Sequence, residues 1–306
     1  MDMYQKRKIR AEKKNNDNQK SLSSVGINWY PGHMAKTKRL IQENLNLIDI
    51  IYEVIDSRIP FSSKIQDIDY LIKDKPRILI MTKYDLCDKL ETNKFIDMYQ
   101  KEGYYVLKYD LTSNINVNEI FDLSNKILED KIIKMKNKGL KKETIRALVI
   151  GIPNVGKSTL INKIVGRKIT VTGNKPGVTK NLSWVRVGKN IELMDSPGIL
   201  WPKLEQEKVA YNLAATTAIK EEILDKDDIA VYIIKFLYKY YREILEKEYH
   251  VSNIDDFEDV FDTIGKYKSL MMKGGYVDYD KVSTLVINDI KSGKIKNITF
   301  DRFDNE

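Results

Sequence analysis

Gly151-Ile-Pro-Asn-Val-Gly-Lys-Ser158 is the stretch that decides the fold we expect. It lies between the apolar run 147–150 and a helical pattern over 159–165, which gives the order strand, GxxxxGKS, helix that a phosphate-binding loop requires. Gly151 and Gly156 permit backbone dihedrals that turn successive amides toward an anion, and the helix adds its positive N-terminal pole. In such a loop Lys157 reaches the β- and γ-phosphates of a nucleotide, and the Ser158 hydroxyl ligates magnesium.

The composition describes a soluble globular chain of 306 residues, long enough for two domains, with 42% hydrophobic and 31% charged residues. Cys87 is the sole cysteine, which excludes an internal disulfide, and we interpret it as a small buried residue. No apolar run approaches the length of a membrane span, and the N-terminus is charged rather than signal-like. We therefore expect a cytoplasmic protein without membrane contact.

The net charge of +8 favours a polyanionic partner, and two segments concentrate it. Residues 1–24 form a basic arm that is predicted to be flexible, and 131–146 hold seven basic residues against one acid. Each segment is interpreted either as an RNA contact or as a solvated, solubilising stretch, and the sequence leaves both readings open.

Strands and helices alternate over the first two thirds of the chain, which is typical of a doubly wound α/β domain with a mostly parallel sheet. The patterns predict strands at 48–55, 77–81, 104–109, 147–150, 183–187 and 191–194, and helices ending near 47, over 92–101, 117–136 and 159–165.

From about residue 202 only helical patterns remain. One apolar stripe runs from Ile229 to Leu245 with Asp228 as its cap, another follows Asp255, and a third stops near Gly293. The predicted division is a basic arm over 1–24, a nucleotide-binding domain over 25–201 and a small all-helical domain over 202–306.

Three further features belong to the predicted site: two motifs that directly follow expected strands, and a threonine in the loop over 173–179. Thr82-Lys-Tyr-Asp85 is close to the N/T-K-x-D guanine-reading motif of GTPases, in which the Asp85 carboxylate accepts the N1 and N2 donors of guanine and the Lys83 stem covers the base. Asp195-Ser-Pro-Gly198 matches DxxG, and Thr179 suits the switch threonine that closes over magnesium and the γ-phosphate. Because the guanine motif precedes the phosphate loop, the sites coincide only in a circularly permuted P-loop GTPase domain.

The chain thus resembles the circularly permuted GTPases, and most closely the bacterial ribosome biogenesis GTPase A (YlqF-type) family, over residues ~26–300. The resemblance is carried by Trp29-Tyr-Pro-Gly-His-Met-Ala-Lys36, Asp56-Ser-Arg-Ile-Pro60, Pro153-Asn-Val-Gly-Lys-Ser158, Lys175-Pro-Gly-Val-Thr179, Asp195-Ser-Pro-Gly-Ile-Leu-Trp-Pro-Lys203, Leu213-Ala-Ala-Thr-Thr-Ala-Ile219 and Gly274-Gly275. It implies GTP hydrolysis coupled to late maturation of the large ribosomal subunit, with contacts to rRNA and ribosomal proteins.

The resemblance also implies the site residues. Nucleotide contacts are expected from Thr82, Lys83, Asp85, Thr112, Asn154, Val155, Gly156, Lys157, Ser158, Thr159, Thr179 and Gly198. Magnesium is expected to be held by Ser158, Thr179 and Asp195. The expected catalytic residues are His33, Lys157, Thr179 and Gly198. Leu111 departs from the family's guanine loop, so that the expected contact there is the Thr112 amide.

Two positions, His33 and Asn154, have alternative interpretations. Ile199 stands where other GTPases place a water-positioning glutamine, so His33 or ribosomal groups are expected to replace it, although His33 can equally be a turn histidine bonded to backbone. Asn154 resembles the asparagine that holds potassium in potassium-activated GTPases, where the cation stabilises developing negative charge, or it simply favours the turn.

The expected protein is a slow, monomeric GTPase that large-subunit particles accelerate. Two other functions stay open: a nucleotide-gated RNA-binding scaffold for which hydrolysis is incidental, and a permuted GTPase that acts on another RNA. An ATPase fits least, because Asp85 would face the mismatched edge of adenine.

Overall fold

The computed structural model describes residues 27–28, 32–65, 68–139, 144–168, 183–188, 191–199, 203–204, 207–216 and 224–303. Residues 1–24, which we interpret as a basic arm, lie outside the described residues. Among the described helices, none combines the length and the apolar character needed to cross a lipid bilayer.

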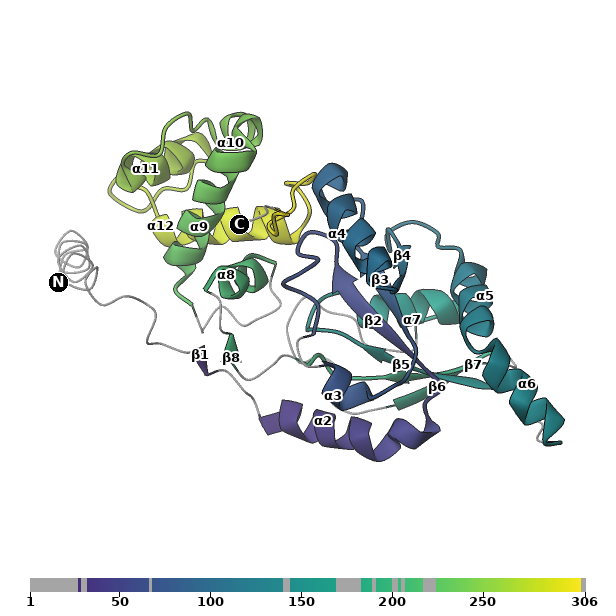
Figure 1. Cartoon of the computed structure of the whole chain (residues 1–306). Coiled ribbons are helices and arrows are strands. Elements are labelled where there is room, and N and C mark those ends of the chain that lie inside the picture. The colour runs from purple at the N-terminus through teal and green to yellow at the C-terminus, as the bar shows by residue number, and fades with distance from the viewer. Residues whose placement is uncertain are drawn as a thin grey trace.

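A mostly parallel sheet forms the centre of the N-terminal two thirds (Figure 1). Its six strands lie in the order β4 (Tyr105–Lys108), β3 (Arg77–Thr82), β2 (Ile50–Asp56), β5 (Ile145–Ile150), β7 (Ile191–Asp195) and β6 (Ser183–Val187). Among the described strands of this sheet, only the β6–β7 pair is antiparallel. The permuted α/β fold expected from the order of the motifs is confirmed, because the guanine-motif strand β3 precedes β5 in the chain yet lies two strands from it.

Helices cover both faces of this sheet, since alternate side chains of each strand point to opposite sides. Ile55, Leu79 and Met81 pack with Phe95 and Tyr99 of α4 (Lys89–Lys101). On the other face the Tyr52 hydroxyl lies 2.8 Å from the Ser124 hydroxyl of α5 (Val117–Ile127). The remaining helices around the sheet are α2 (Gly32–Asn44), α3 (Ile68–Ile72), α6 (Glu129–Asn137) and α7 (Lys157–Val165).

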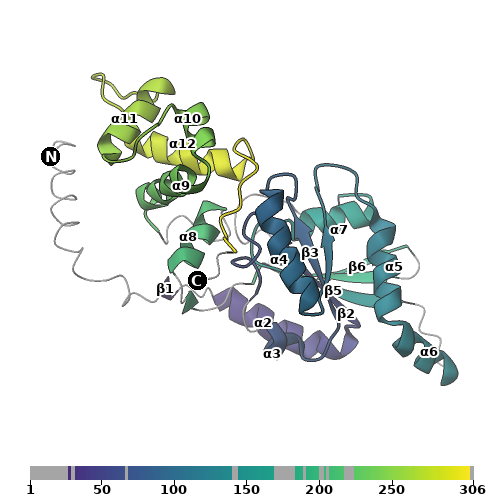
Figure 2. The same ribbon diagram turned by 45° about the horizontal axis from the view of Figure 1, so that its top comes forward.

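The C-terminal third is helical, and Figures 1 and 2 show it beside the α4 end of the sheet. Its helices are α8 (Glu207–Ala215), α9 (Lys226–Tyr240), α10 (Arg242–Tyr249), α11 (Phe257–Tyr267) and α12 (Tyr279–Lys291). Helix α12 is the one predicted to stop near Gly293. A short antiparallel pair, β1 (Ile27–Asn28) with β8 (Lys203–Leu204), joins the two ends of the α/β part.

Several expected boundaries were wrong. The long helix over 117–136 is broken at Leu128, which is only 4% exposed and separates α5 from α6. The stripe from Ile229 to Leu245 is likewise two helices, which meet at Tyr241. The caps also differ from those expected: Asp225 caps α9 in place of Asp228, and Asp256 caps α11 in place of Asp255. In both cases several acids stand close together, and the one whose carboxylate reaches a first-turn amide becomes the cap.

Candidate nucleotide-binding site

The phosphate loop connects β5 to α7 at the C-terminal edge of the parallel strands, where ligands bind in such sheets. Gly151 lies so close to β2 that a Cβ there would be 2.4 Å from the Val54 carbonyl oxygen. Gly156 has φ +100°, a conformation that favours glycine, and it caps the N-terminus of α7. The Val155 side chain is buried, and Ser158 and Thr159 follow in the first turn of α7. Both glycines are therefore required by the loop's geometry.

Lys157 and Asp195 lie together beneath this loop. The Lys157 ammonium donates to the carbonyl oxygens of Gly151 at 3.1 Å and Ile152 at 2.8 Å. Burial lowers the pKa of Lys157 to about 8, against the opposing effect of the Asp195 charge. Burial raises the pKa of Asp195 to about 6, and the Lys157 cation limits the rise. The pair places one cation and one carboxylate at the floor of the site.

The Asp195 carboxylate fits a role in holding magnesium. The side chain is 1% exposed, and neither of its oxygens has a hydrogen-bond partner among the described residues. A buried carboxylate without partners is costly, and a bound divalent cation or its water would satisfy it. Ser158, at the start of α7, offers the hydroxyl oxygen that the same ion commonly takes in phosphate-loop proteins.

The segment after Asp195 lies directly against the phosphate loop. A Cβ on Gly198 would be 2.7 Å from backbone atoms of Pro153, so only glycine permits this approach. The Ile199 amide donates to the Gly151 carbonyl at 3.1 Å, and the Ser196 hydroxyl donates to the Val149 carbonyl at 2.8 Å. Ile199 is fully buried. Its apolar side chain has no group that could orient water.

The guanine motif reaches the same loop from β3. The Thr82 hydroxyl donates to the Val155 carbonyl at 2.5 Å, and the Lys83 ammonium donates to the Asn154 carbonyl at 2.9 Å. Asp85 is partly buried, and burial raises the pKa of its carboxyl group. The motif and the phosphate loop are thus hydrogen-bonded directly to each other, although Lys83 and Asn154 are 71 residues apart in the chain.

Thr112 lies in the loop after β4, but its amide is already used. It donates to the Asp110 carboxylate at 2.7 Å, and the Thr112 hydroxyl donates to the same carboxylate at 2.6 Å. A guanine contact from this amide would require the Asp110 interaction to open. Two other expected residues are not placed beside these: Thr179 lies outside the described residues, and His33 lies in α2 without a described side chain.

The structure adds residues whose role sequence reasoning missed. Asp56 and Arg58 were noted only as part of a motif, yet both are buried next to the site. The Asp56 carboxylate accepts the Lys83 ammonium at 2.7 Å and pairs with the Arg58 guanidinium at 2.9 Å. The available signal was a pair of opposite charges, Asp56 and Arg58, at the end of a mostly apolar strand.

Known proteins match the sequence of this chain over most of their length. A protein named ribosome biogenesis GTPase A from Priestia megaterium is 47% identical over 277 residues, which cover 90% of this chain and 96% of that protein. The chain belongs to the ribosome biogenesis GTPase A family. A family member from Thermotoga maritima is 28% identical over 276 residues, which cover 90% of this chain and 94% of that protein.

A family model described as 50S ribosome-binding GTPase matches residues 146–273. The crystal structure of GNP-bound YlqF from Thermotoga maritima has the same fold, with a TM-score of 0.60 and 24% identity over 87% of this chain and 98% of that one. As a member of the ribosome biogenesis GTPase A family, this chain is a GTP hydrolase of ribosome biogenesis, with GTP and GDP as its nucleotides and magnesium as its typical metal.

Proposed function

We propose that this GTPase acts at a late step in assembly of the large ribosomal subunit, and that the subunit stimulates its hydrolysis of GTP. The matching family model is described as 50S ribosome-binding, and the +8 net charge suits an RNA-rich particle. The observation that carries the catalytic part is the buried Asp195 carboxylate, with unpartnered oxygens, beside Lys157.

In this proposal the chain's residues bind and orient the nucleotide. Lys157 exchanges its two carbonyl partners for β- and γ-phosphate oxygens, and the amides from Asn154 to Thr159 surround the phosphates. Thr82, Lys83, Asp85 and the Thr112 amide hold the guanine end. Magnesium, held by Ser158, Thr179 and Asp195, would neutralise charge on the phosphate oxygens when bound.

Hydrolysis is expected to be slow without a partner. Ile199 is buried and apolar, so the attacking water must be oriented by His33 or by groups of the subunit. The Gly198 amide and Thr179 would close over the γ-phosphate. Asn154 would hold potassium beside the phosphates, where a cation stabilises developing negative charge.

We infer further that the chain divides near residue 202 into a GTPase domain (25–201) and a helical domain (202–306), with 1–24 as a basic arm. The arm, the helical domain and the lysines of α6 would contact rRNA. Lys134 and Lys136 of α6, and Lys138 directly after it, are exposed, while Lys131 and Arg146 are bound to acids. The basic segment 131–146 therefore contributes fewer available cations than its sequence suggests. The protein would work as a cytoplasmic monomer.

The test is GTP turnover in potassium and in sodium buffer, with and without purified large subunits. Stimulation by subunits, larger in potassium, is the expected result. Equal turnover with and without precursor subunits would contradict the ribosomal role, and equal turnover in the two salts would contradict the Asn154 cation site.

The two histidines offer a matched pair of variants. His33→Ala should abolish subunit-stimulated turnover while binding of GTP persists. His250→Ala should leave turnover unchanged, because His250 ends α10 and stacks on Tyr267 at 3.9 Å between ring centroids. If His33→Ala loses stimulated turnover yet still supports subunit assembly in cells, hydrolysis is incidental and the protein is a nucleotide-gated scaffold.

A further inference from the structure

Arg58 is a charged side chain at the boundary between the sheet and the helical region. It follows β2 and is 1% exposed, the largest of the fully buried side chains in the described part of the chain. Its Nη1 donates to the Ile290 carbonyl of α12 at 2.8 Å, while Nε and Nη2 donate to the two Asp56 carboxylate oxygens at 3.1 and 2.9 Å. One guanidinium thus joins the last turn of α12 to the end of β2.

The connection continues to the phosphate loop. The Asp56 Oδ2 atom that accepts from Arg58 also accepts the Lys83 ammonium at 2.7 Å. The same ammonium donates to the Asn154 carbonyl at 2.9 Å. Hence a single path of charged hydrogen bonds runs from α12 through Arg58, Asp56 and Lys83 to the phosphate loop.

A second set of bonds holds the guanine-reading loop from behind. The Leu86 carbonyl, one residue beyond the TKYD motif, accepts the amides of Asn297 at 2.8 Å and Ile298 at 3.3 Å. The Phe300 amide donates to the Arg58 carbonyl at 2.7 Å. The segment that follows α12 therefore contacts both the motif loop and Arg58, and Figures 1 and 2 show it beside α4.

We infer that Arg58 is a positioning residue that couples the seating of α12 to the nucleotide site through the Asp56–Lys83 pair. The inference rests on the nucleotide site proposed above. Its energetic basis is that each bond has a buried charged partner. If α12 moved away, one buried Arg58 N–H would lose its acceptor, and if Arg58 were replaced, Lys83 would be the remaining cation paired with Asp56.

Coupling of this kind is reciprocal. A nucleotide that fixes Lys83 and the phosphate loop stabilises the docked α12, and a partner that displaces α12 weakens nucleotide binding by the same factor. The helical region could then report the nucleotide state to whatever it binds, and sense it in return.

Arg77 provides a matched control for Arg58. Arg77 opens β3, is 7% exposed and pairs with the fully buried Glu53 at 3.1 Å. It therefore has the same chemistry and similar burial, but it lies at the opposite end of the strands from the nucleotide site. Arg58→Lys and Arg77→Lys each keep the charge and lose the fork of donors.

The first measurement is the dissociation constant of a fluorescent GDP analogue, with urea unfolding of each variant alongside. Both variants should lose stability, but only Arg58→Lys should weaken nucleotide binding, by roughly tenfold. Equal dissociation constants for the two variants would overturn the coupling. Lys83→Ala distinguishes failure of the coupling from failure of the proposed guanine site. If Lys83→Ala binds the GDP analogue as tightly as the wild type does, the guanine site itself is refuted. If Lys83→Ala binds more weakly but Arg58→Lys binds normally, only the coupling is refuted.

The second measurement starts with the wild type and then compares the two variants. Hydrogen exchange at the amides of Asn297, Ile298 and Phe300 should slow when GDP is added to the wild type. The slowing should vanish in Arg58→Lys and persist in Arg77→Lys. If the exchange rates of these amides in the wild type did not change on addition of GDP, the inference would be overturned.

Discussion

Strand β2 carries an aspartate at each end, and the two differ in what surrounds them. Asp49, immediately before the strand, is 4% exposed and accepts the Lys131 ammonium and the Arg146 amide, at 2.8 and 2.9 Å. Asp56, the last residue of the strand, is 2% exposed and accepts from Arg58 and Lys83. Both acids are buried, but Lys131 is 47% exposed while Arg58 is 1% exposed.

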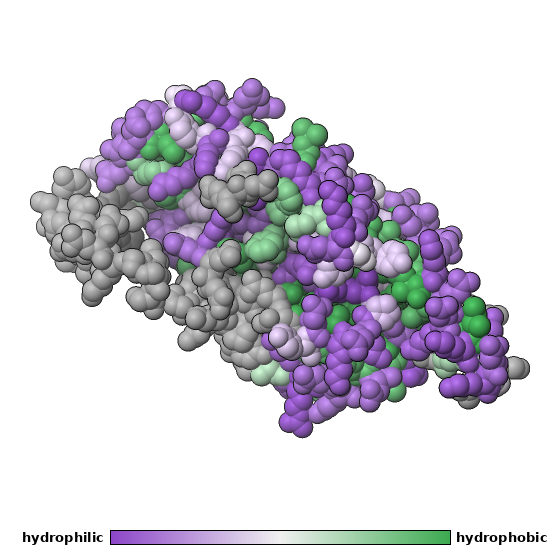
Figure 3. All heavy atoms as spheres, in the orientation of Figure 1, coloured by the Kyte–Doolittle hydropathy of each residue, from purple (hydrophilic) through white to green (hydrophobic). Residues whose placement is uncertain are grey.

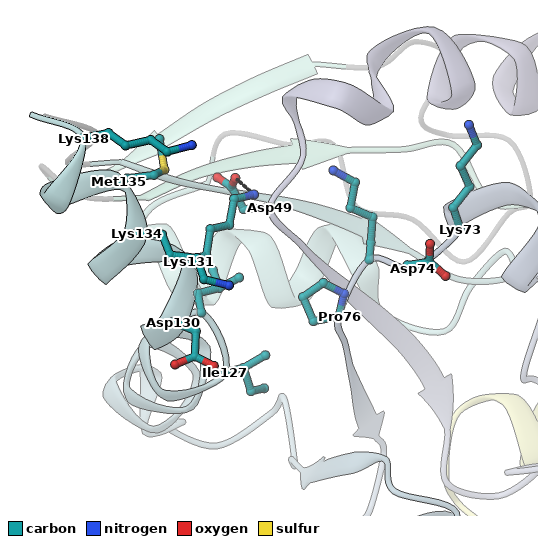
Figure 4. A pocket seen from close by; sticks show the side chains of 12 residues that line it. Asp49, Lys73, Asp74, Pro76, Ile127, Asp130, Lys131, Lys134, Met135 and Lys138 are labelled. Carbon is teal, nitrogen blue, oxygen red and sulfur yellow. Dashed lines mark hydrogen bonds and ion pairs between the residues drawn. The ribbon is translucent and has the colours of Figure 1, made fainter. Parts of the chain in front are cut away.

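The difference follows the polarity of the sheet. The C-terminal ends of parallel strands open onto the nucleotide site, so the Asp56 pair is enclosed between the phosphate loop and α12. The N-terminal ends open onto a hollow of about 620 Å³ beside α6, with Lys131, Lys134 and Lys138 at its wall (Figure 4). Polar side chains dominate the surface in Figure 3, including the end where α6 lies. The same residue type thus joins two parts of the fold at one end and anchors a solvated helix at the other.

The largest difference is expected from removing each acid. Asp56→Ala leaves the buried Arg58 unpaired and should lower the free energy of unfolding by about 3–5 kcal/mol. Asp49→Ala loses a half-exposed ion pair and the hydrogen bond from the Arg146 amide, and should lower the free energy of unfolding by about 1–2 kcal/mol. Urea denaturation of both variants measures the gap. Equal losses would show that burial of the partner does not decide the energy.

Removing a lysine should change GTP turnover at the C-terminal ends of the strands but not at their N-terminal ends. Lys157→Ala should lower GTP turnover by about 100-fold, because it removes a preorganised cation aimed at the phosphates. Lys131→Ala, at the far end of the strands, should leave turnover unchanged. Steady-state phosphate release checks both variants, and slower turnover in Lys131→Ala would mean that α6 influences catalysis.

Acid should weaken the Asp56 contribution. Burial alone would raise the pKa of this carboxyl group, but the Arg58 and Lys83 cations hold it well below the ordinary value of 3.8. Because the folded pKa is the lower one, the stabilisation is complete above the unfolded pKa and is lost as the pH falls through the folded pKa. The stability gap between wild type and Asp56→Ala should therefore narrow as the pH falls from about 5 to about 3 in urea titrations. A constant gap would contradict an ionised Asp56.

The smallest effects are expected on the α6 side. Replacing Lys134, Lys136 and Lys138 by Ala should weaken binding to large-subunit particles several-fold, reduce its salt dependence and leave basal GTP turnover unchanged. Lys131→Ala serves as control, because its ammonium is bound to Asp49. Sedimentation with particles at several salt concentrations would detect the change, and unaltered binding would identify the α6 lysines as a solvated face.

Prediction from sequence succeeded where a few neighbouring residues determine the outcome. The phosphate loop, the strands with their apolar runs and the burial of Cys87 all depend on local pattern. It failed where a distant group intervenes. Helix α9 ends just before Tyr241, whose hydroxyl bonds to Asp88, the Thr299 amide and Arg302. No periodicity in 229–245 reveals those partners.

The candidate site divides in the same way. The sequence by itself determined the chemistry of the nucleotide loops, since GxxxxGKS, TKYD and DxxG each place their donors within a few residues of one another. Only the tertiary structure decided that Lys83 bonds to Asn154 and that Arg58 bonds to Ile290, 232 residues away. The Ile290 acceptor is a backbone carbonyl, which is the same for every residue type. Such a partner leaves no mark in the sequence, and packing of the whole chain alone selects it.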